Sequence, residues 1–358
     1  MSRLPRVIFL IAAVFMSTAS FATTFAVGNC KPNSVEYATI SAAVSDPKTA
    51  NSTIQVCPGT YNEQVLITQP LTLQGVTIGN NSAAVITLPS GAAQTMNGDN
   101  IGIVAYQIGV QNPGGPVNLK DLIVDGTGAS NLGFVGFLGG IFYEDASGTV
   151  TNVNARNQVY QSSGVGIFVA SGQINSASQT VTIQKSVFNN FDSVGMFTVA
   201  AAGLDLTIDS NFVDGASSAQ VGILFSGTGV VKSNVVGGTV RGLSLENSSA
   251  TATANTIQGG ISIVAGSNTV TGDSIDAGGR FGVQIQGTGS NTVKSNTIVN
   301  SSTAVYGCGS NLESPPASGD TVSGNTILDA SIGIQMPSGN TTIPNTFELV
   351  PAATQACP

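Results

Sequence analysis

The sequence predicts an all-β chain that folds as a single-stranded, right-handed parallel β-helix, a solenoid, with a short cap helix at its N-terminal end. Three observations lead to this prediction: a recurring tetrapeptide, a glycine-led strand after each copy, and the composition of a turn-rich β protein. Charged residues make up 8% of the chain, whereas an ordinary soluble domain has about 25%. Glycine accounts for 44 of 358 residues, and the apolar fraction of 41% is too high for a disordered chain.

The tetrapeptide has a polar residue at its second position, as in Ser210-Asn211-Phe212-Val213. The polar residues of the successive copies are Asn211, Asn234, Asn255, Asp273, Asn296 and Asn325. They are separated by 23, 21, 18, 23 and 29 positions. At a sharp turn, Asn tolerates left-handed backbone and bonds to nearby main chain, and stacked copies can bond to one another. We therefore predict that these side chains form a ladder of hydrogen bonds along the stack. We favour this role over a row of ligands for metal ions or sugars.

A glycine-led strand follows each copy, as in Gly222-Ile223-Leu224-Phe225 and Gly282-Val283-Gln284-Ile285. Apolar residues alternate with other residues in these strands, which is the period of a β-strand with one inward face. A propeller blade needs about 40 residues or more, and the consensus of leucine-rich repeats is absent. A parallel β-helix with coils about 4.8 Å apart fits the observed period.

The N-terminal 22 residues have the pattern of a secretory signal peptide. Arg3 and Arg6 precede an apolar run over 7–16, and Ser20-Phe21-Ala22 places small residues before a cleavage site after Ala22. The run is shorter than the roughly 20 residues of a membrane span, although a buried N-terminal helix is an alternative. We expect export to the periplasm or the medium, no membrane span, and a β-helix domain over 23–358.

The ends of an open stack need protection, because unpaired strand edges invite further strands. We expect an N-terminal cap and first coil over 23–60, with a short helix over Tyr37–Val44, and a C-terminal cap over 340–358. The four cysteines are Cys30, Cys57, Cys308 and Cys357. Three pairings are possible, and we favour Cys30–Cys57 with Cys308–Cys357 because the ends of a solenoid sequence are its spatial ends. A zinc site would need closer cysteine spacing or His.

The balance of acidic and basic residues limits the classes of molecule that we expect the chain to bind. Without Arg3 and Arg6, 9 basic residues face 19 acidic ones, a net charge of −10. Nucleic acid is not expected as a partner, because its backbone requires a basic surface. An acidic polysaccharide would be repelled unless cations bridged it. We expect a monomer.

One stretch holds the candidate catalytic residues Asp125, Glu144, Asp145 and Arg156. Two carboxylates about 5–10 Å apart suit glycoside hydrolysis, and clustered carboxylates with carbonyls suit calcium as a cofactor. Arg156 would neutralise a uronate or act as a lyase base. The alternative is that Asp125 is a turn residue of the plain repeat. In an enzyme these carboxylates converge in one groove, and in a scaffold they point apart.

The opening of the mature chain resembles that of the pectin-lyase-like β-helix superfamily. The resemblance is carried by Thr39–Val44, Ile54–Tyr61, Glu63–Ile67 and Leu71–Gly75, and the repeats extend it along the mature chain. Pectin methylesterases and periplasmic copper-pathway proteins of the NosD type share this opening. The resemblance implies the fold rather than an activity, since the Gly-His-Gly motif of polygalacturonases and the Asp-Phe-Ile-Phe-Gly strand of the methylesterases are absent.

The sequence thus favours an exported β-helix that serves as a non-catalytic surface or matrix scaffold in contact with glycans. The alternative is a lyase or glycoside hydrolase that acts on a uronate-containing polysaccharide. A periplasmic accessory protein of the NosD type is a third hypothesis, which depends on the opening segment alone.

Overall fold

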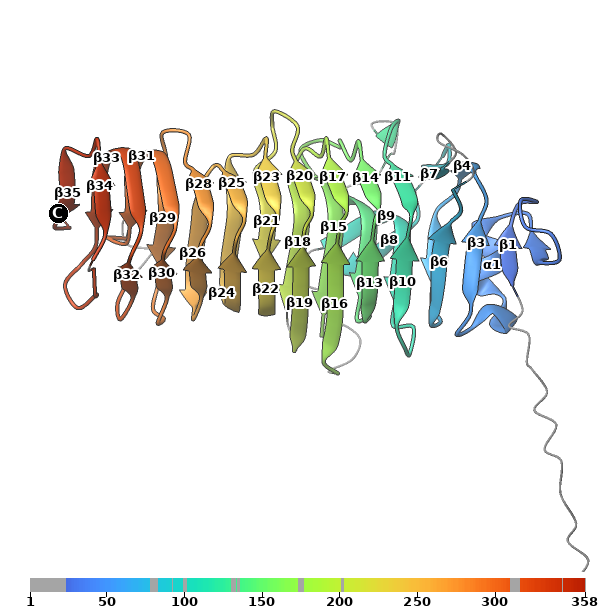
Figure 1. Ribbon diagram of the computed structural model, residues 1–358. Helices are drawn as coiled ribbons and strands as arrows, with labels where there is room; N and C mark the ends of the chain where they lie inside the picture. Colours follow the sequence, from blue (N-terminus) through green and yellow to red (C-terminus); the bar gives the residue numbers. More distant parts are fainter. Residues whose placement is uncertain are drawn as a thin grey trace, which may run out of the picture.

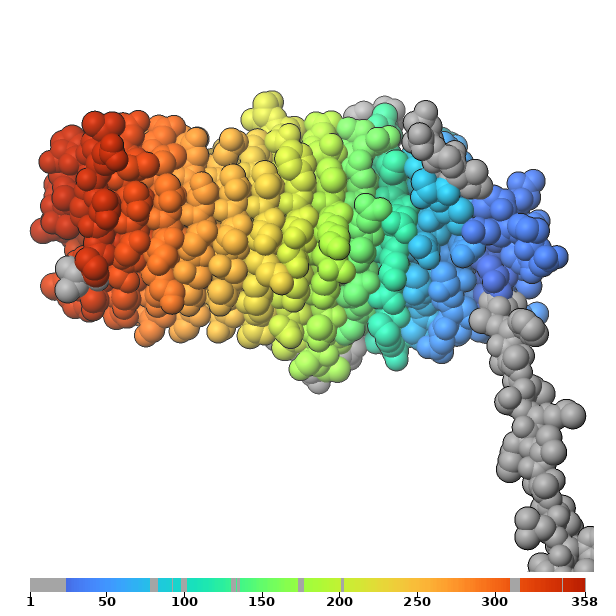
Figure 2. All heavy atoms as spheres, in the orientation of Figure 1, coloured from blue at the N-terminus to red at the C-terminus, as the bar shows by residue number. Residues whose placement is uncertain are grey.

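The computed structural model describes residues 24–77, 83–91, 93–98, 102–129, 133, 136–172, 177–200, 203–309, 316–342 and 344–357. The predicted signal peptide, 1–22, lies outside these residues. Figure 1 shows one long stack of coils that runs from the N-terminal end to the C-terminal end, and in Figure 2 successive coils form adjacent bands of an unbroken rod.

Each coil contributes one strand to each of three faces, and each strand pairs in parallel with its equivalent in the next coil. In the middle of the stack, β19 (Leu204–Asp209), β20 (Phe212–Asp214) and β21 (Val221–Phe225) make up one coil. They pair with β22 (Thr228–Lys232), β23 (Val235–Gly237) and the start of β24 (Arg241–Thr253). The coil repeat is therefore the sequence repeat, and the predicted parallel β-helix is confirmed.

The first face precedes the Asn turn. Besides β19, β22 and the end of β24, it contains β1 (Phe25–Val27), β3 (Thr53–Val56), β6 (Leu71–Gly75), β10 (Val117–Lys120), β13 (Gly148–Thr151), β16 (Gln179–Gln184), β27 (Thr269–Thr271), β30 (Thr292–Lys294) and β32 (Thr321–Ser323). The short strand β2 (Val35–Tyr37) pairs with β1 at the N-terminal edge.

The second face follows the Asn turn. Besides β20 and β23, it contains β4 (Gly59–Asn62), β7 (Ala84–Thr87), β11 (Leu122–Asp125), β14 (Asn154–Arg156), β17 (Val187–Asn189), β25 (Thr256–Gln258), β28 (Ser274–Asp276), the starts of β31 (Thr297–Tyr306) and β33 (Thr326–Gln335), and β34 (Thr346–Glu348).

The third face completes each coil. Besides β21 and the start of β24, it contains β5 (Val65–Ile67), β9 (Gly102–Gln111), β12 (Phe137–Glu144), β15 (Gly164–Ser171), β18 (Val194–Ala200), β26 (Ile261–Gly266), β29 (Phe281–Gln286), the ends of β31 and β33, and β35 (Ala352–Gln355). Among the described strands, only β8 (Thr95–Gly98) pairs antiparallel, with β9.

The interior is filled by the inward residues of all three faces. The apolar residue two positions after a ladder residue is buried, as Val236 and Ile257 show with 1% exposure each. Two of the glycines that open third-face strands lie over such a residue: a Cβ on Gly222 would be 2.3 Å from Val236 Cγ1, and one on Gly242 would be 2.3 Å from Ile257 Cγ2. The two repeated elements of the sequence therefore meet in the core, and the glycine leaves room for the apolar side chain.

The predicted ladder forms. Asn211 Nδ2 donates to Asn234 Oδ1 at 3.0 Å, and Asn234 Nδ2 donates to Asn255 Oδ1 at 3.0 Å. The ladder continues through Asp273, Asn296 and Asn325 to Asn345. The expected reason for Asn was wrong in one respect, because the left-handed residue is the one before it: φ is 58° at Ser210. The Asn side chain instead satisfies the main chain of the turn, as shown by the bond from the Asn211 backbone N–H to Asn234 Oδ1.

Asp273 is the irregular member of this ladder. Its Oδ1 accepts from Asn255 Nδ2 at 2.8 Å, but its Oδ2 is buried without a hydrogen-bond partner among the described residues. At the equivalent place, the Nδ2 of Asn255 donates to the Val231 carbonyl and that of Asn296 to the Val270 carbonyl. Burial raises the pKa of Asp273 to about 6, although hydrogen bonds from Asn255 and Thr271 act in the opposite direction.

A second ladder, which was not predicted, lies at the turn from the third face to the first. Asn268 and Asn291 bond through Nδ2 and Oδ1 at 3.3 Å, and Asn291 Nδ2 donates to Asp320 Oδ1 at 3.0 Å. The backbone N–H of Asp320 then donates to Asn340 Oδ1. The sequence carries a weak signal for it, because each of the first three residues is followed by Thr-Val.

The N-terminal end is covered by α1 (Ile40–Ser45), for which the expected helix was Tyr37–Val44. The helix starts later because Thr39 is its N-cap, and Tyr37 belongs to β2. Glu63 accepts hydrogen bonds from the backbone N–H groups of Ile40 and Ser41 at 2.8 and 2.9 Å. A single 3-10 turn, Pro47–Thr49, follows.

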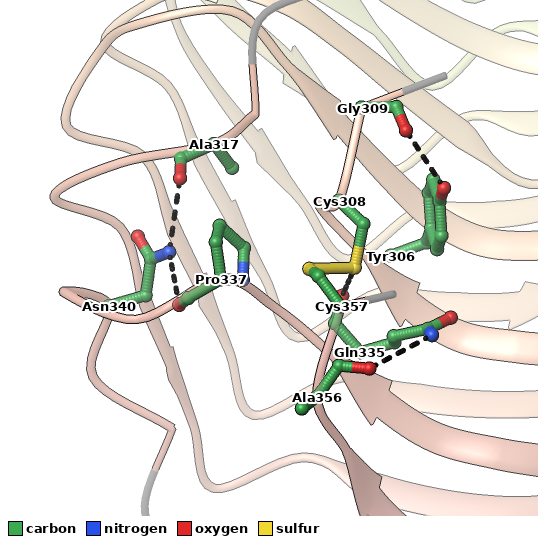
Figure 3. The surroundings of a disulfide bond; sticks show 9 residues. All are labelled: Tyr306, Cys308, Gly309, Ala317, Gln335, Pro337, Asn340, Ala356 and Cys357. Carbon is green, nitrogen blue, oxygen red and sulfur yellow. Dashed lines mark hydrogen bonds between the residues drawn. A yellow bond between two sulfur atoms is a disulfide. The ribbon is translucent and has the colours of Figure 1, made fainter. Parts of the chain in front are cut away.

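Both predicted disulfides are present, Cys30–Cys57 and Cys308–Cys357. Figure 3 shows the second one, which ties the final segment to the coil that contains Tyr306. The expected C-terminal cap, 340–358, includes β34 and β35, which pair with β33 and so form a last coil. No helix in the described ranges is long and apolar enough to span a membrane.

Candidate functional site

The structure brings two of the four predicted catalytic residues together. Asp125 and Arg156 are register partners at the ends of β11 and β14, and Arg156 Nε donates to Asp125 Oδ2 at 2.8 Å. Asp125 also accepts from the Thr127 backbone N–H at 3.0 Å and from Asn157 Nδ2 at 2.9 Å. Burial alone would raise the pKa of Asp125, but these bonds to the charged form outweigh it and lower the pKa to about 2.

Glu144 and Asp145 lie at another corner of the coil. Glu144 ends β12, where its Oε2 accepts from Gln111 Nε2 at 2.6 Å. Asp145 begins the next turn, and its Oδ1 accepts from the Gly172 backbone N–H at 2.6 Å. The expected convergence with Asp125 is therefore not observed, and a catalytic role for these residues stays a prediction. Among the described residues, no group of three or more acidic or Cys side chains could hold a metal ion.

A cavity of a different kind lies where the second face turns into the third face. We call it the corner groove: it has a volume of about 570 Å³ and is lined by Gly238, Thr239, Gln258, Asp276, Arg280 and Asn300, among others. A second cavity of about 290 Å³, here called the slot, adjoins it. The slot is lined by Arg241, Gly259, Ile261, Ser262, Phe281 and Gln284, together with Arg280, which lines both cavities.

The slot lies beside a short turn: two residues link β25 to β26, whereas three link β23 to β24 and four link β28 to β29. Leu243 pairs with Ile261, and Ile261 pairs with Val283. The turn before β26 consists of Gly259 and Gly260 alone, and the coils on either side of β26 contribute Arg241 of β24 and Phe281 of β29. These two residues lie two coils apart, which is about 10 Å. Gly259 has a φ of 87°, and a Cβ there would be 2.8 Å from the Thr239 carbonyl oxygen, so its backbone conformation also favours glycine.

The floor of the slot carries a hydroxyl group. Ile261 and Ile263 point into the core, whereas Ser262 lies between them on the outward side of β26. Ser262 is 1% exposed, and its Oγ has no hydrogen-bond partner among the described residues. A buried hydroxyl without a partner is costly, and Ser262 is one of the residues that line the slot.

The arginines of the two cavities are not neutralised by the protein. Residues 23–358 contain three arginines, of which Arg156 is paired with Asp125. The other two, Arg241 and Arg280, form no ion pair within the described part of the chain. The nearby Asp276 instead accepts from the Gly278 backbone N–H at 3.0 Å and from Asn300 at 3.1 Å. Two uncompensated guanidinium groups therefore line this site in an otherwise acidic protein.

Phe281 lines the slot and belongs to an aromatic pair. The rings of Phe281 and Tyr306 are stacked, with centroids 4.4 Å apart and planes at 12°. The Tyr306 hydroxyl donates to the Gly309 carbonyl at 3.0 Å, which fixes the ring (Figure 3). Tyr306 belongs to the coil beyond Phe281, on the side away from β26, and Phe281 lines the slot.

Comparison with known proteins identifies the fold. The family model described as "Right handed beta helix region" matches residues 139–298, which include the strands around the slot. The match and the structural neighbours agree with the fold described above, a right-handed parallel β-helix. No curated protein matches this β-helix significantly in sequence.

Three solved structures share the β-helix architecture at low sequence identity. The A-module of mannuronan C-5 epimerase AlgE4 from Azotobacter vinelandii has a TM-score of 0.61 and 17% identity, over 88% of this chain and 92% of that chain. A GH136 lacto-N-biosidase from Eubacterium ramulus has a TM-score of 0.62 and 8% identity, over 92% and 68%. The tailspike protein gp49 of Acinetobacter baumannii bacteriophage Fri1, a capsular polysaccharide depolymerase, has a TM-score of 0.52 and 11% identity, over 88% and 59%. At these identities the likeness establishes the fold.

Sequence reasoning missed the residues of the slot. Arg241, Arg280 and Phe281 precede or open glycine-led strands that looked like ordinary members of the repeat. One signal could have drawn attention to this place, because the spacing from Asn255 to Asp273 is 18 residues, the shortest in the ladder series. A short coil between longer ones leaves a recess on the surface of the β-helix.

Proposed function

We propose that this β-helix is an exported, monomeric, non-catalytic scaffold that binds a glycan through the corner groove and the slot. The observation that carries the proposal is the slot itself. It combines an aromatic ring, an unpartnered hydroxyl and two uncompensated guanidinium groups in the lining of a recess of about 290 Å³. Apolar walls with a few placed polar groups are typical of small-molecule sites.

The neighbouring corner groove supports a chain ligand rather than a free monosaccharide. It runs past the turns of four successive coils, from Ala219 through Gly238 and Gly259 to Gly278. A polymer laid along the stack would place one sugar in the slot and the adjoining sugars over these turns. The solved structures with this architecture include a mannuronan epimerase and a capsular polysaccharide depolymerase, so the fold is compatible with long glycan chains.

Export is supported by the pattern of residues 1–22 and by the two disulfides, since disulfides persist in oxidising compartments. The non-catalytic part of the proposal is supported by the separation of the predicted catalytic carboxylates. Asp125 is held in an ion pair with Arg156, and Glu144 and Asp145 lie at a different corner.

The test is a binding and turnover screen on protein comprising residues 23–358. Neutral glucans, polygalacturonate, alginate and sulfated glycans would be presented in calorimetry, and products would be followed by reducing ends and by absorbance of unsaturated sugars. We expect binding without turnover. Product formation that is lost in Asp125→Ala or Arg156→Ala would overturn the non-catalytic assignment, and the absence of binding across the panel would overturn glycan binding.

A pair of matched variants ties binding to the site. Gln284→Trp fills the slot from its half-buried outward wall, and we expect it to weaken glycan binding at least ten-fold. Thr297→Trp adds the same ring to an exposed position of the second face, and we expect it to bind like the parent. Equal affinities of the two variants would place the glycan elsewhere.

A further inference from the structure

We propose that the slot over Gly259 is a subsite for one sugar residue that carries an anionic substituent, a carboxylate or a sulfate. In this arrangement Arg241 and Arg280 bind the anionic group, and Phe281 packs against the sugar ring. The inference rests on the proposed glycan-binding function and names the chemistry of the ligand.

The size of the slot limits the ligand to a single ring. Its volume of about 290 Å³ is at the lower end of the range for small-molecule sites, about 300–1,000 Å³. Its length is set by the two coil spacings between Arg241 and Phe281, about 10 Å. One pyranose ring with its substituents fits between an arginine and an aromatic face at this distance, and its neighbours in a chain would lie in the corner groove.

The charges select the substituent. A guanidinium group presents a planar fork of donors that matches a carboxylate or a sulfate in a bidentate manner. Arg241 and Arg280 lack ion-pair partners among the described residues. The rest of the chain is strongly acidic, with a net charge of −10 over residues 23–358. A neutral glycan would leave both guanidinium groups uncompensated, whereas one anionic sugar would use them.

The remaining walls suit the rest of a sugar residue. Tyr306 supports one face of the Phe281 ring at 4.4 Å, so the ring is fixed and its other face can pack against the apolar C–H face of a pyranose. Ser262 supplies a hydroxyl without a protein partner, and Gln284 an amide on the outward wall. These groups can bond to ring hydroxyls, and Ser262 would gain the partner that it lacks in the free protein.

The site also leads to the opposite expectation, about binding of acidic polysaccharides, from the one that the net charge of the chain suggests. A chain with this net charge should repel acidic polysaccharides unless cations bridge them. Because the two uncompensated arginines line adjoining cavities, attraction is local, and it should not require a divalent cation. Binding should weaken as salt rises, since the guanidinium groups are near the surface.

The experiment compares three oligosaccharides of equal length, an oligogalacturonate, an oligosaccharide of chondroitin sulfate and a neutral β-glucan, by calorimetry in chelator. The variants are Arg241→Gln, Arg280→Gln and the control Lys294→Gln, which removes an exposed cation of the first face. Both arginines are on the surface, and circular dichroism would confirm that each variant is folded. We expect each arginine variant to bind the preferred anionic ligand about 10- to 100-fold more weakly and Lys294→Gln to change it less than two-fold.

The two anionic ligands distinguish a carboxylate from a sulfate as the bound group. Equal or tighter binding of the neutral glucan, or arginine variants that behave like Lys294→Gln, would overturn the anionic subsite. If glycan binding were nevertheless sensitive to Gln284→Trp, the proposed glycan-binding function would stand, but without the anionic subsite. If none of the wider panel of glycans bound, the proposed function would fail first.

Discussion

The two halves of the third face have the same backbone and opposite surfaces. A single outward column runs through Phe142, Phe168, Phe197, Leu224, Ser244, Ser262, Gln284 and Tyr306, as the register of successive strands shows. In the N-terminal half, Phe142 and Phe168 are fully buried although they point away from the core. In the C-terminal half, the same column contains Ser and Gln and borders the slot.

In the N-terminal half, other side chains cover the outward aromatic residues of the third face. Met96 of β8 packs with Tyr106, Phe142 and Phe168 in a second apolar cluster outside the main core. Phe137 and Phe168 meet edge to face, with centroids 5.5 Å apart. The comparison teaches that side chains and turn lengths decide where a regular solenoid has a binding surface, because its strands are nearly equivalent.

The two halves also hold acids of opposite behaviour. Asp125, in the N-terminal half, has an ion-pair partner and a pKa lowered to about 2. Asp273, in the C-terminal half, has an unpartnered oxygen and a pKa raised to about 6. Stability should therefore respond to pH in opposite directions at the two places.

The largest expected effect comes from opening the covered half. Phe168→Ala removes a fully buried ring and leaves a cavity, which should lower the free energy of unfolding by about 3–5 kcal/mol. Urea denaturation followed by circular dichroism would measure it. A loss below about 1 kcal/mol would mean that the aromatic cluster contributes little, and that the two halves differ less than the polarity of their columns indicates.

The next effect concerns Asp273. Its folded pKa is above the unfolded value, so its contribution to stability is fully present below pH 4 and is lost as pH rises through 6. The loss should be about 2–3 kcal/mol. Asp273→Asn adds the amide that other ladder positions have and should stabilise the protein above pH 6. Denaturation midpoints of parent and variant at pH 4 and pH 8 would test this, and an equal difference at both pH values would contradict it.

A smaller effect of opposite sign is expected at Asp125. Its folded pKa is below the unfolded value, so its contribution is present above pH 4 and is lost as pH falls towards 2. Because Arg156 is partly exposed to solvent, the loss should be about 1–2 kcal/mol. Comparing the acid limb of parent and Asp125→Asn measures it: the variant should lack this part of the pH dependence.

The smallest effect is expected in the open half. Ser262→Ala removes a hydroxyl that has no partner, so the stability of the free protein should change by less than about 0.5 kcal/mol or rise slightly. Glycan affinity should fall nonetheless, because the hydroxyl is available to a sugar. A clear loss of stability would show that Ser262 has a structural role, and would weaken the contrast between the two halves.

The sequence by itself determined the architecture. The spacing of Asn211, Asn234 and Asn255 predicted both the coil and its ladder, because an element that recurs once per coil must stack on its own copies. The disulfide pairing was predictable for a related reason, since the order of coils in space is their order in the chain. The cap helix followed from local apolar spacing, with an error of three residues at its start.

Only the tertiary structure decided where a site could lie. Arg241 and Phe281 line one cavity because β24 and β29 both pair with β26. The separations of these strands in the chain differ from coil to coil, and no local pattern specifies that register. The candidate carboxylates were expected to converge because they are close in sequence. Asp125 and Asp145 are 20 residues apart, and in this fold that separation places them at different corners of the coil. The covering of Phe142 and Phe168 likewise depends on β8, which is remote from both in the chain. The length of the repeat and the order of the coils follow from the sequence of a solenoid. The exposure of a side chain depends on the assembled stack.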